Sequence, residues 1–235
     1  MKIAGLQKMT LLDYPGKVAC TVFLCGCNFR CPYCHNSELL DGQAEPVMDG
    51  EELLAFLEKR RGLLDGVCIS GGEPTLQPEL PDFLGRIKAL GYAVKLDTNG
   101  SRPAVLESLV SQGLVDYVAM DIKNGPQHYA QTVGLQQLAM ENIGRSMRFL
   151  LEDRVDYEFR TTVVKPLHDV ASVKEMARWL LELVPGKKAK RLFLQPFIDR
   201  DTVLFADLHA PEEAELASFV EILSASAVTV AVRGQ

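Results

Sequence analysis

The sequence has no apolar run close to the roughly 18 residues that a membrane-spanning helix needs, and residues 1–5 lack the long apolar core of a signal peptide. It also lacks a concentration of positive charge: 25 Lys and Arg residues stand against 31 Asp and Glu residues. Internal repeats and low-complexity tracts are missing as well. These absences argue against a membrane protein and against a nucleic-acid-binding protein, and we expect a soluble, cytoplasmic protein.

The composition is that of a globular protein, with 47% apolar and 24% charged residues in a chain of 235. No break in composition marks a second domain, so the sequence predicts a single domain over residues 1–235. Six cysteines could pair in a small secreted protein, but four of them fall within residues 25–34 of this larger chain. That crowding favours metal or redox chemistry over disulfide bonds.

Short apolar runs alternate with helical patterns along the chain, which predicts parallel strands joined by helical crossovers. We expect strands at 18–24, 67–70, 93–97, 115–121, 157–164 and 191–195. We expect helices at 50–61, 79–90, 102–112, 135–151 and 170–184, and residues 211–233 as a last helix (211–224) followed by a further strand (228–232). Six strand–helix units are too few for a closed eight-stranded barrel, so the predicted fold is α/β, a partial (β/α)6 barrel. An open, doubly wound sheet is the alternative.

The long connection at residues 25–48 contains Cys27, Cys31 and Cys34 in the spacing C-x3-C-x2-C. Long connections without secondary structure are usually functional. Three thiolates suit a [4Fe–4S] cluster and leave one iron open to a ligand, because a closed cluster takes four. Two alternatives remain: residues 31–34 as a C-P-Y-C dithiol of a thiol oxidoreductase, and a structural zinc site that adds His35.

Polar residues stand where the predicted strands end, and the carboxyl ends of parallel strands meet at one rim. Charges of both signs at that rim could hold a zwitterionic ligand or a cation, although glycine and Asx residues also suit plain turns. The residues are Gly71, Gly72 and Glu73 after one strand, Asp97 and Asn99 at the next, Asp121 and Lys123 at the next, and Arg160 within the fifth.

The cysteine motif, with Tyr33 as the aromatic residue of C-x3-C-x-aromatic-C, resembles the radical S-adenosylmethionine superfamily, and the G-G-E at 71–73 resembles its second motif. The resemblance implies that Cys27, Cys31 and Cys34 hold the cluster and that its open iron binds S-adenosylmethionine. It further implies that 71–73 contact the methionine amino group.

Residues 12–17 and 26–36 resemble one branch more closely, the activating proteins of anaerobic ribonucleoside-triphosphate reductases, which belong to the glycyl-radical-enzyme activating enzymes. This implies a glycyl radical enzyme, an anaerobic ribonucleotide reductase, as protein partner, and a flavodoxin- or ferredoxin-type electron donor. The alternative within the superfamily is a small-molecule enzyme similar to carboxy-deazaguanine synthases. The implied ligand contacts lie around the methionine carboxylate, near the D-T-N-G and D-x-K motifs, and are Asp97, Asn99, Asp121 and Lys123, with a monovalent cation at Asp97 and Asp121. Arg160 is implied near the ribose, and Asn36 is implied to hold the ligand or the substrate backbone.

The resemblance breaks down at Gln195, near the place where formate-lyase activating enzymes carry a substrate-contacting histidine. His168 is a weak substitute, since it is expected on a different loop. The substrate contact is therefore the part of the family resemblance that applies least to this sequence.

Overall fold

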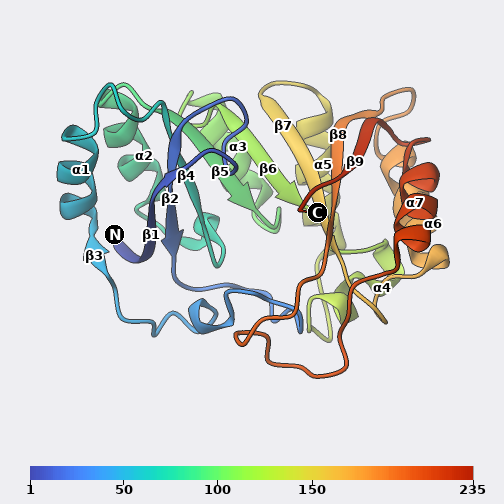
Figure 1. The fold of residues 1–235 in the computed structure, drawn as a ribbon. Coiled ribbons are helices and arrows are strands. Elements are labelled where there is room, and N and C mark those ends of the chain that lie inside the picture. The colour runs from blue at the N-terminus through green and yellow to red at the C-terminus, as the bar shows by residue number, and fades with distance from the viewer. Residues whose placement is uncertain (235) are drawn as a thin grey trace. The chain divides into compact units, whose positions relative to one another are not determined.

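The computed structural model describes residues 1–234 (Figure 1). The chain folds as two compact units. Unit one comprises Met1–Asn28, Glu38–Ala119 and Arg154–Asp156. Unit two comprises Phe29–Ser37, Met120–Asp153 and the chain from Tyr157 onward. The boundary between the units falls inside the cysteine motif, after Asn28, and a single domain over the whole chain stays a prediction.

Unit one holds five whole strands in the order β3-β1-β2-β4-β5. Strands β2, β4 and β5 are parallel, whereas β1 runs antiparallel to β2 and to β3. The strands at 18–24, 67–70 and 93–97 are confirmed, but β1 was not predicted. Only Ile3 and Thr10 of β1 are buried, so it lacks the apolar alternation of a strand. The bounds are β1 (Lys2–Thr10), β2 (Ala19–Leu24), β3 (Met48–Asp49), β4 (Gly66–Gly71) and β5 (Ala93–Thr98).

The helices of unit one confirm the predictions at 50–61, 79–90 and 102–112, with slightly shorter spans. Helix α1 begins with a capping box, in which Asp49 Oδ1 accepts from Glu52 N and Glu52 Oε2 accepts from Asp49 N, both at 2.9 Å. Its leucines are buried, and α1 lies beside α2 in Figure 1. The bounds are α1 (Gly50–Glu58), α2 (Leu80–Ala89), α3 (Pro103–Ser111) and the short 3₁₀ helices η1 (Ser37–Leu39) and η2 (Pro74–Leu76).

Unit two contains the parallel strands β7, β8 and β9, and helices α6 and α7 lie side by side (Figure 1). Strand β6 begins in unit one and ends in unit two, where Ile122 N donates to Arg160 O of β7 at 2.8 Å. The strands at 115–121, 157–164, 191–195 and 228–232 are thus confirmed. The bounds are β6 (Tyr117–Asp121), β7 (Asp156–Val163), β8 (Ala189–Pro196), β9 (Ala227–Val232), α4 (Pro126–Thr132), α5 (Met140–Leu151), α6 (Val170–Leu183) and α7 (Glu213–Leu223).

The predicted helix at 135–151 begins late, at Met140, and the preceding helix α4 was not predicted. Gly134 explains the interruption, because its φ is +69° and a Cβ there would lie 2.1 Å from Arg30 O. A helix cannot run through that residue. The predicted helices at 170–184 and 211–224 are confirmed as α6 and α7.

The strands form a mostly parallel α/β sheet that is not closed into a barrel, as predicted. Among residues 1–234, no helix has the length and hydropathy needed to cross a membrane.

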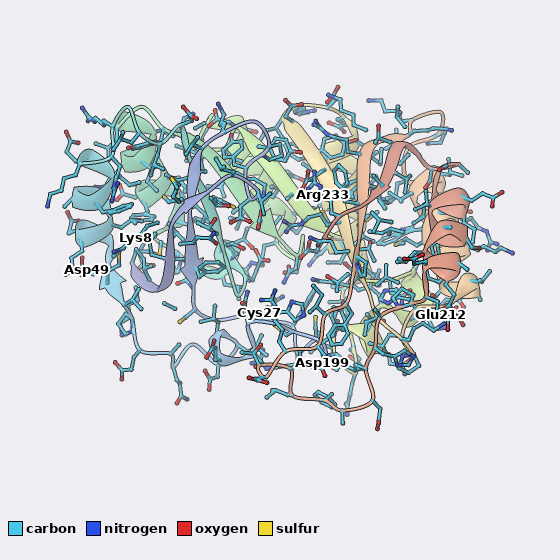
Figure 2. The ribbon with its side chains drawn as sticks, in the orientation of Figure 1. Lys8, Cys27, Asp49, Asp199, Glu212 and Arg233 are labelled. Carbon is cyan, nitrogen blue, oxygen red and sulfur yellow. The ribbon has the colours of Figure 1, made fainter. Side chains whose placement is uncertain are left out.

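Unit two also contains an ion pair next to its last strand, with a buried carboxylate and a partly exposed guanidinium. Arg233, labelled in Figure 2, donates from Nη1 and Nη2 to the two carboxylate oxygens of Glu158 at 2.7 and 2.8 Å. The Glu158 side chain is only 1% exposed, and the guanidinium carbon of Arg233 lies 3.3 Å from the ring centroid of Phe193. Two charge-assisted hydrogen bonds, one to each carboxylate oxygen, thus connect the end of β9 to β7.

Candidate functional site

The first part of the cysteine loop belongs to unit one and is held by backbone hydrogen bonds. Gly26 N donates to Leu39 O at 2.7 Å and Cys27 N donates to Leu40 O at 3.1 Å. Cys27 itself, labelled in Figure 2, is half-buried. The turn after β4 adds two further bonds, since Gly72 N donates to Leu24 O and the next amide, at residue 73, to Gly26 O, both at 2.8 Å. The position of the loop therefore depends on the turn at residues 71–73.

Gly71 and Gly72 are required by this close backbone approach. A Cβ on Gly71 would lie 2.3 Å from both N and O of Leu24, and the φ of Gly71 is +116°. A Cβ on Gly72 would lie 2.2 Å from Gly26 O. The missing side chains thus make room for the strand end and the cysteine loop. The predicted contact of these glycines with a ligand stays a prediction.

Glu73 is completely buried at the junction of the strand ends β4 and β5. Its Oε1 accepts from Thr75 N at 3.0 Å, from the Thr75 hydroxyl and from Thr98 Oγ1 at 2.8 Å, and its Oε2 accepts from Asn99 N at 2.6 Å. Burial raises the pKa of the carboxyl, although these donors oppose the change. Glu73 therefore holds the turn of β5 in place, and its predicted role as a ligand contact stays a prediction.

The Asn99 side chain connects that buried carboxylate to the cysteine motif. Its Nδ2 donates to Asn28 Oδ1 at 3.0 Å and lies 4.0 Å from Cys27 Sγ. Asn28 Nδ2 in turn donates to Ser101 Oγ at 2.9 Å, and Ser101 N donates to Asn99 Oδ1 at 2.9 Å. Sequence reasoning found Asn99 but missed Asn28 and Ser101, which have no motif of their own.

Asp97 is paired with a lysine that the sequence analysis missed. Lys95 is 1% exposed and forms an ion pair with Asp97 Oδ1, while Asp97 Oδ2 accepts from Ser70 Oγ at 3.1 Å. The signal was present as a lone lysine between Val94 and Leu96 in an apolar strand. A monovalent cation at Asp97 would have to compete with this ammonium group.

The second part of the cysteine loop belongs to unit two and carries Cys31, Tyr33 and Cys34. Arg30 N donates to Val133 O at 2.8 Å, which anchors this part. Tyr33 is 4% exposed, and its hydroxyl has no hydrogen-bond partner among residues 1–234. A buried hydroxyl without a partner is costly unless a ligand satisfies it. This group fits a site that binds a polar ligand beside the cysteines.

Asp121, Lys123 and Arg160 form a compact charged group in unit two. The Asp121 carboxylate accepts from Lys123 Nζ and from Arg160 Nε, both at 3.0 Å. Burial alone would raise the pKa of Asp121, but the two cations together lower it to about 2. Burial would likewise lower the pKa of Lys123, yet Asp121 and its neighbours hold it well above its usual value. Arg160 is 16% exposed, so its side chain does not point into solvent.

The structure also places three further residues named in the sequence analysis: His168, Asn36 and Gln195. His168 is completely buried, with Nε2 2.8 Å from Lys123 O and Nδ1 3.1 Å from Val164 O, so it supports the backbone and does not replace the missing substrate histidine. Burial lowers its pKa. Asn36 and Gln195 are half-buried, and their predicted roles stay predictions.

None of the six cysteines, all within the described residues, forms a disulfide bond. Cys20 and Cys68 are completely buried in strands, as expected, and burial raises the pKa of Cys20 to about 12.

In residues 1–234 no group of three or more His, Cys, Asp or Glu side chains has an arrangement that could hold a single metal ion. Cys27 and Cys31 fall in different units, although the chain keeps their Cα atoms within about 14 Å of each other. Three thiols on one loop, with a buried tyrosine hydroxyl, fit an iron–sulfur cluster that keeps an open iron.

Comparisons with known proteins agree with this chemistry. A sequence profile described as the Radical SAM superfamily matches residues 21–182. A protein of Methanocaldococcus jannaschii, named as a candidate glycyl-radical enzyme activating enzyme, is 31% identical over 237 residues, which cover 98% of this chain and 95% of that protein. A 7-carboxy-7-deazaguanine synthase of Koribacter versatilis is 33% identical over 150 residues, 63% of this chain and 62% of that protein.

The fold also matches solved structures. A domain of the pyruvate-formate lyase-activating enzyme from Bacteroides vulgatus superimposes with a TM-score of 0.56 at 22% sequence identity. The match covers 72% of this chain and 99% of that domain. At this level of identity the likeness concerns the fold alone.

Proposed function

Because the chain belongs to the radical S-adenosylmethionine superfamily, whose members use a [4Fe–4S] cluster and S-adenosylmethionine, we propose that it is a glycyl-radical-enzyme activating enzyme. Support comes above all from the end-to-end similarity to the Methanocaldococcus jannaschii protein, at 31% identity over 98% of this chain. The resemblance of residues 12–17 and 26–36 makes an anaerobic ribonucleotide reductase the proposed partner. A flavodoxin- or ferredoxin-type protein is the proposed electron donor.

The proposed chemistry needs only a few groups from this chain. When bound, a [4Fe–4S] cluster would supply the electron for cleavage of S-adenosylmethionine to methionine and a 5′-deoxyadenosyl radical, which would take a hydrogen atom from a glycine Cα of the partner. The thiolates that would hold three of its irons are those of Cys27, Cys31 and Cys34. The buried Tyr33 hydroxyl, which has no hydrogen-bond partner among residues 1–234, could donate to a ligand beside them.

The charged residues bind and orient the zwitterionic end of S-adenosylmethionine. Lys123 stays protonated, because the pKa of its ammonium is raised by Asp121, and its charge favours a carboxylate ligand. Asp97 is ion-paired with Lys95, and the resemblance makes it, with Asp121, the proposed site of a monovalent cation beside the methionine carboxylate. Arg160 donates from Nε to Asp121 at 3.0 Å, and the resemblance makes it the proposed contact near the ribose.

Anaerobic reconstitution with iron and sulfide tests the cluster assignment. The wild-type protein should develop a broad absorption near ~400 nm and release 5′-deoxyadenosine when dithionite is added. Cys31→Ala should lose both properties, whereas Cys25→Ala, at a half-buried thiol outside the motif, should keep them. Cleavage at the wild-type rate by Cys31→Ala would contradict the assignment. Activity that persists after iron removal would instead support the C-P-Y-C thiol oxidoreductase.

Electron paramagnetic resonance tests the target of the radical. A mixture with a purified anaerobic ribonucleotide reductase, S-adenosylmethionine and dithionite should give the doublet of a glycyl radical. A small-molecule enzyme is the second candidate, favoured by the 33% identity to a 7-carboxy-7-deazaguanine synthase over 63% of this chain. It would be supported if a metabolite alone coupled to cleavage and no protein partner gave a radical.

A further inference from the structure

The connection between β8 and α7, residues 197–212, is long and lies directly against the cysteine motif. We call it the β8–α7 loop; it contains no helix or strand, and Asp199 marks it in Figure 2. His35 Nε2 lies 2.7 Å from Ile198 O, and the Ser37 hydroxyl donates to Thr202 O. Two residues that closely follow Cys34 are thus bonded to the backbone of this loop.

One side of the loop is packed into the protein. Phe197 is 3% exposed and packs in one apolar cluster with Tyr33 and Val164. Val203 and Leu208 of the loop pack against the same cluster, and so does Cys31. The inner side of the β8–α7 loop therefore supports the second part of the cysteine motif.

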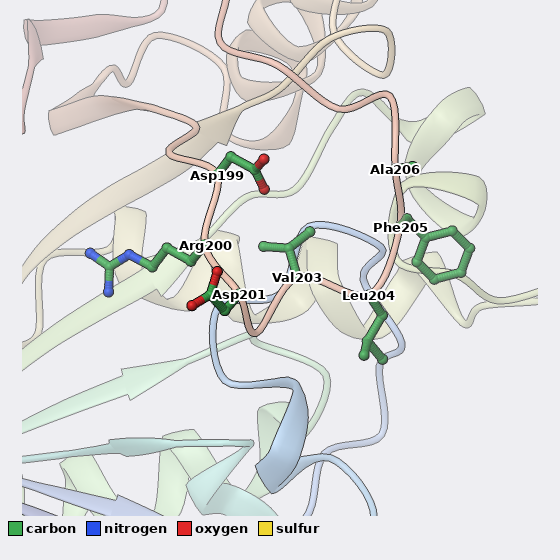
Figure 3. Close-up of a pocket in the computed structure, with 7 residues that line it drawn as sticks. All are labelled: Asp199, Arg200, Asp201, Val203, Leu204, Phe205 and Ala206. Carbon is green, nitrogen blue, oxygen red and sulfur yellow. The ribbon is translucent and has the colours of Figure 1, made fainter.

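The other side of the loop exposes large apolar side chains. Ile198 is 48% exposed, Leu204 71% and Phe205 59%. Figure 3 shows Leu204 and Phe205 on one limb of the loop and Asp199 and Asp201 on the other, around a cavity of about 430 Å³. Leu204 and Phe205 are adjacent in the chain and both line this cavity, and large apolar side chains exposed together often mark a surface that binds another protein.

The charge of the loop indicates what that molecule is like. Three exposed aspartates, at positions 199, 201 and 207, stand against one exposed arginine at position 200. A negative rim around apolar side chains attracts a partner that presents apolar side chains and positive charge.

We propose that the outer side of the β8–α7 loop docks the protein partner through a surface next to its glycine-bearing segment, and that this surface is apolar and positively charged. The inference rests on the proposed function. Position is the reason for choosing this surface, since the inner side of the same loop holds Cys31 and Tyr33. The exposed Leu11 and Leu12 of unit one lie before the start of β2, at the strand end opposite Leu24 and the cysteine loop.

Paired variants test the docking surface. Leu204→Glu with Phe205→Glu should raise the KM for a purified anaerobic ribonucleotide reductase at least tenfold in a glycyl-radical assay. Leu12→Glu is the matched control, at 88% exposure, and should leave that KM unchanged. Cluster absorbance and thermal unfolding check that each variant is folded and loaded.

A second variant tests the charge. The double variant Asp199→Lys with Asp201→Lys changes two exposed side chains and should also raise the KM for the reductase. Added salt should weaken the interaction of the reductase with the wild type, and it should weaken the interaction with this variant less. An unchanged KM in both loop variants, with radical formation by the wild type, would overturn the docking inference alone. If the wild type cleaves S-adenosylmethionine but forms no glycyl radical, the proposed function fails and the docking inference fails with it.

Discussion

Replacing Glu73 by alanine should destabilise the protein strongly, although it removes a buried charge. The carboxylate accepts from the backbone amides of Thr75 and Asn99 at 3.0 and 2.6 Å and from the hydroxyls of Thr75 and Thr98. The hydroxyls can rotate toward other acceptors, but the two amides cannot. A buried amide without an acceptor costs about 1–3 kcal/mol, so the two together cost about 2–6 kcal/mol.

Relief of the buried charge offsets part of that loss. Because burial raises the pKa of Glu73, the ionised carboxylate is less favourable here than in water, and its removal returns some free energy. We therefore expect Glu73→Ala to lose about 2–3 kcal/mol of unfolding free energy, at the lower end of that range. Glu73→Gln keeps the shape of the side chain, but its NH2 group would face one of the hydrogen-bond donors. We therefore expect this variant to lose about 1–3 kcal/mol of unfolding free energy.

Urea denaturation, monitored by circular dichroism, measures the change in unfolding free energy. The iron and sulfide content of each variant after reconstitution is a second readout. Both variants should also load less cluster, because Asn99, which Glu73 holds, contacts Asn28 in the cysteine motif. The control is Glu51→Gln, which removes a carboxylate from an exposed ion pair with Arg86 and should leave the unfolding midpoint unchanged. Unfolding of Glu73→Ala at the wild-type urea concentration would refute the role of Glu73 as the anchor of this turn.

Two further predictions concern buried charges of unit two. The pKa of Asp121, lowered to about 2 from 3.8, implies about 2 kcal/mol of stability that is present above pH ~4 and lost as the pH falls toward 2. The unfolding free energies of wild type and Asp121→Asn should therefore converge in acid, and a difference that stays constant with pH would count against the ion pairs. Arg233→Ala leaves Glu158, 1% exposed, without its bidentate partner and should lower the free energy of unfolding by about 1.5–3 kcal/mol, because the guanidinium is itself 35% exposed. Adding Glu158→Gln should recover much of that loss, and no recovery would contradict the pairing.

The regular elements were predictable because their burial is periodic. Strands such as β2 and β4 are continuous apolar runs, and helices such as α6 carry buried residues at helical spacing. Strand β1 was missed since only two of its residues are buried, and α4 because it is a single short segment before Gly134. Local pattern alone carries no signal for such elements.

The candidate site was predictable as far as its motifs reach. The cysteines and the G-G-E sequence are recognisable by spacing, whereas the roles of their neighbours depend on register. Glu73 meets Thr98 and Asn99 only because β4 and β5 are parallel and adjacent, which places their carboxyl ends together. The same arrangement of strands brings three further residues into hydrogen bonds at the site: Asn28, Ser101 and Lys95. Their contacts follow from tertiary structure and cannot be read from sequence spacing.

The anchoring of the cysteine loop has a consequence for how the enzyme withstands oxygen. Backbone bonds from Gly26 and Cys27 to Leu39 and Leu40 close the loop at its base, and the bond from Arg30 to Val133 fixes a later point. None of these bonds involves iron, in contrast to small zinc domains that unfold without their metal. Loss of the cluster would leave a folded protein with its thiols still in place. Renewed iron and sulfide under reducing conditions should then restore the cluster in a protein that has kept its fold.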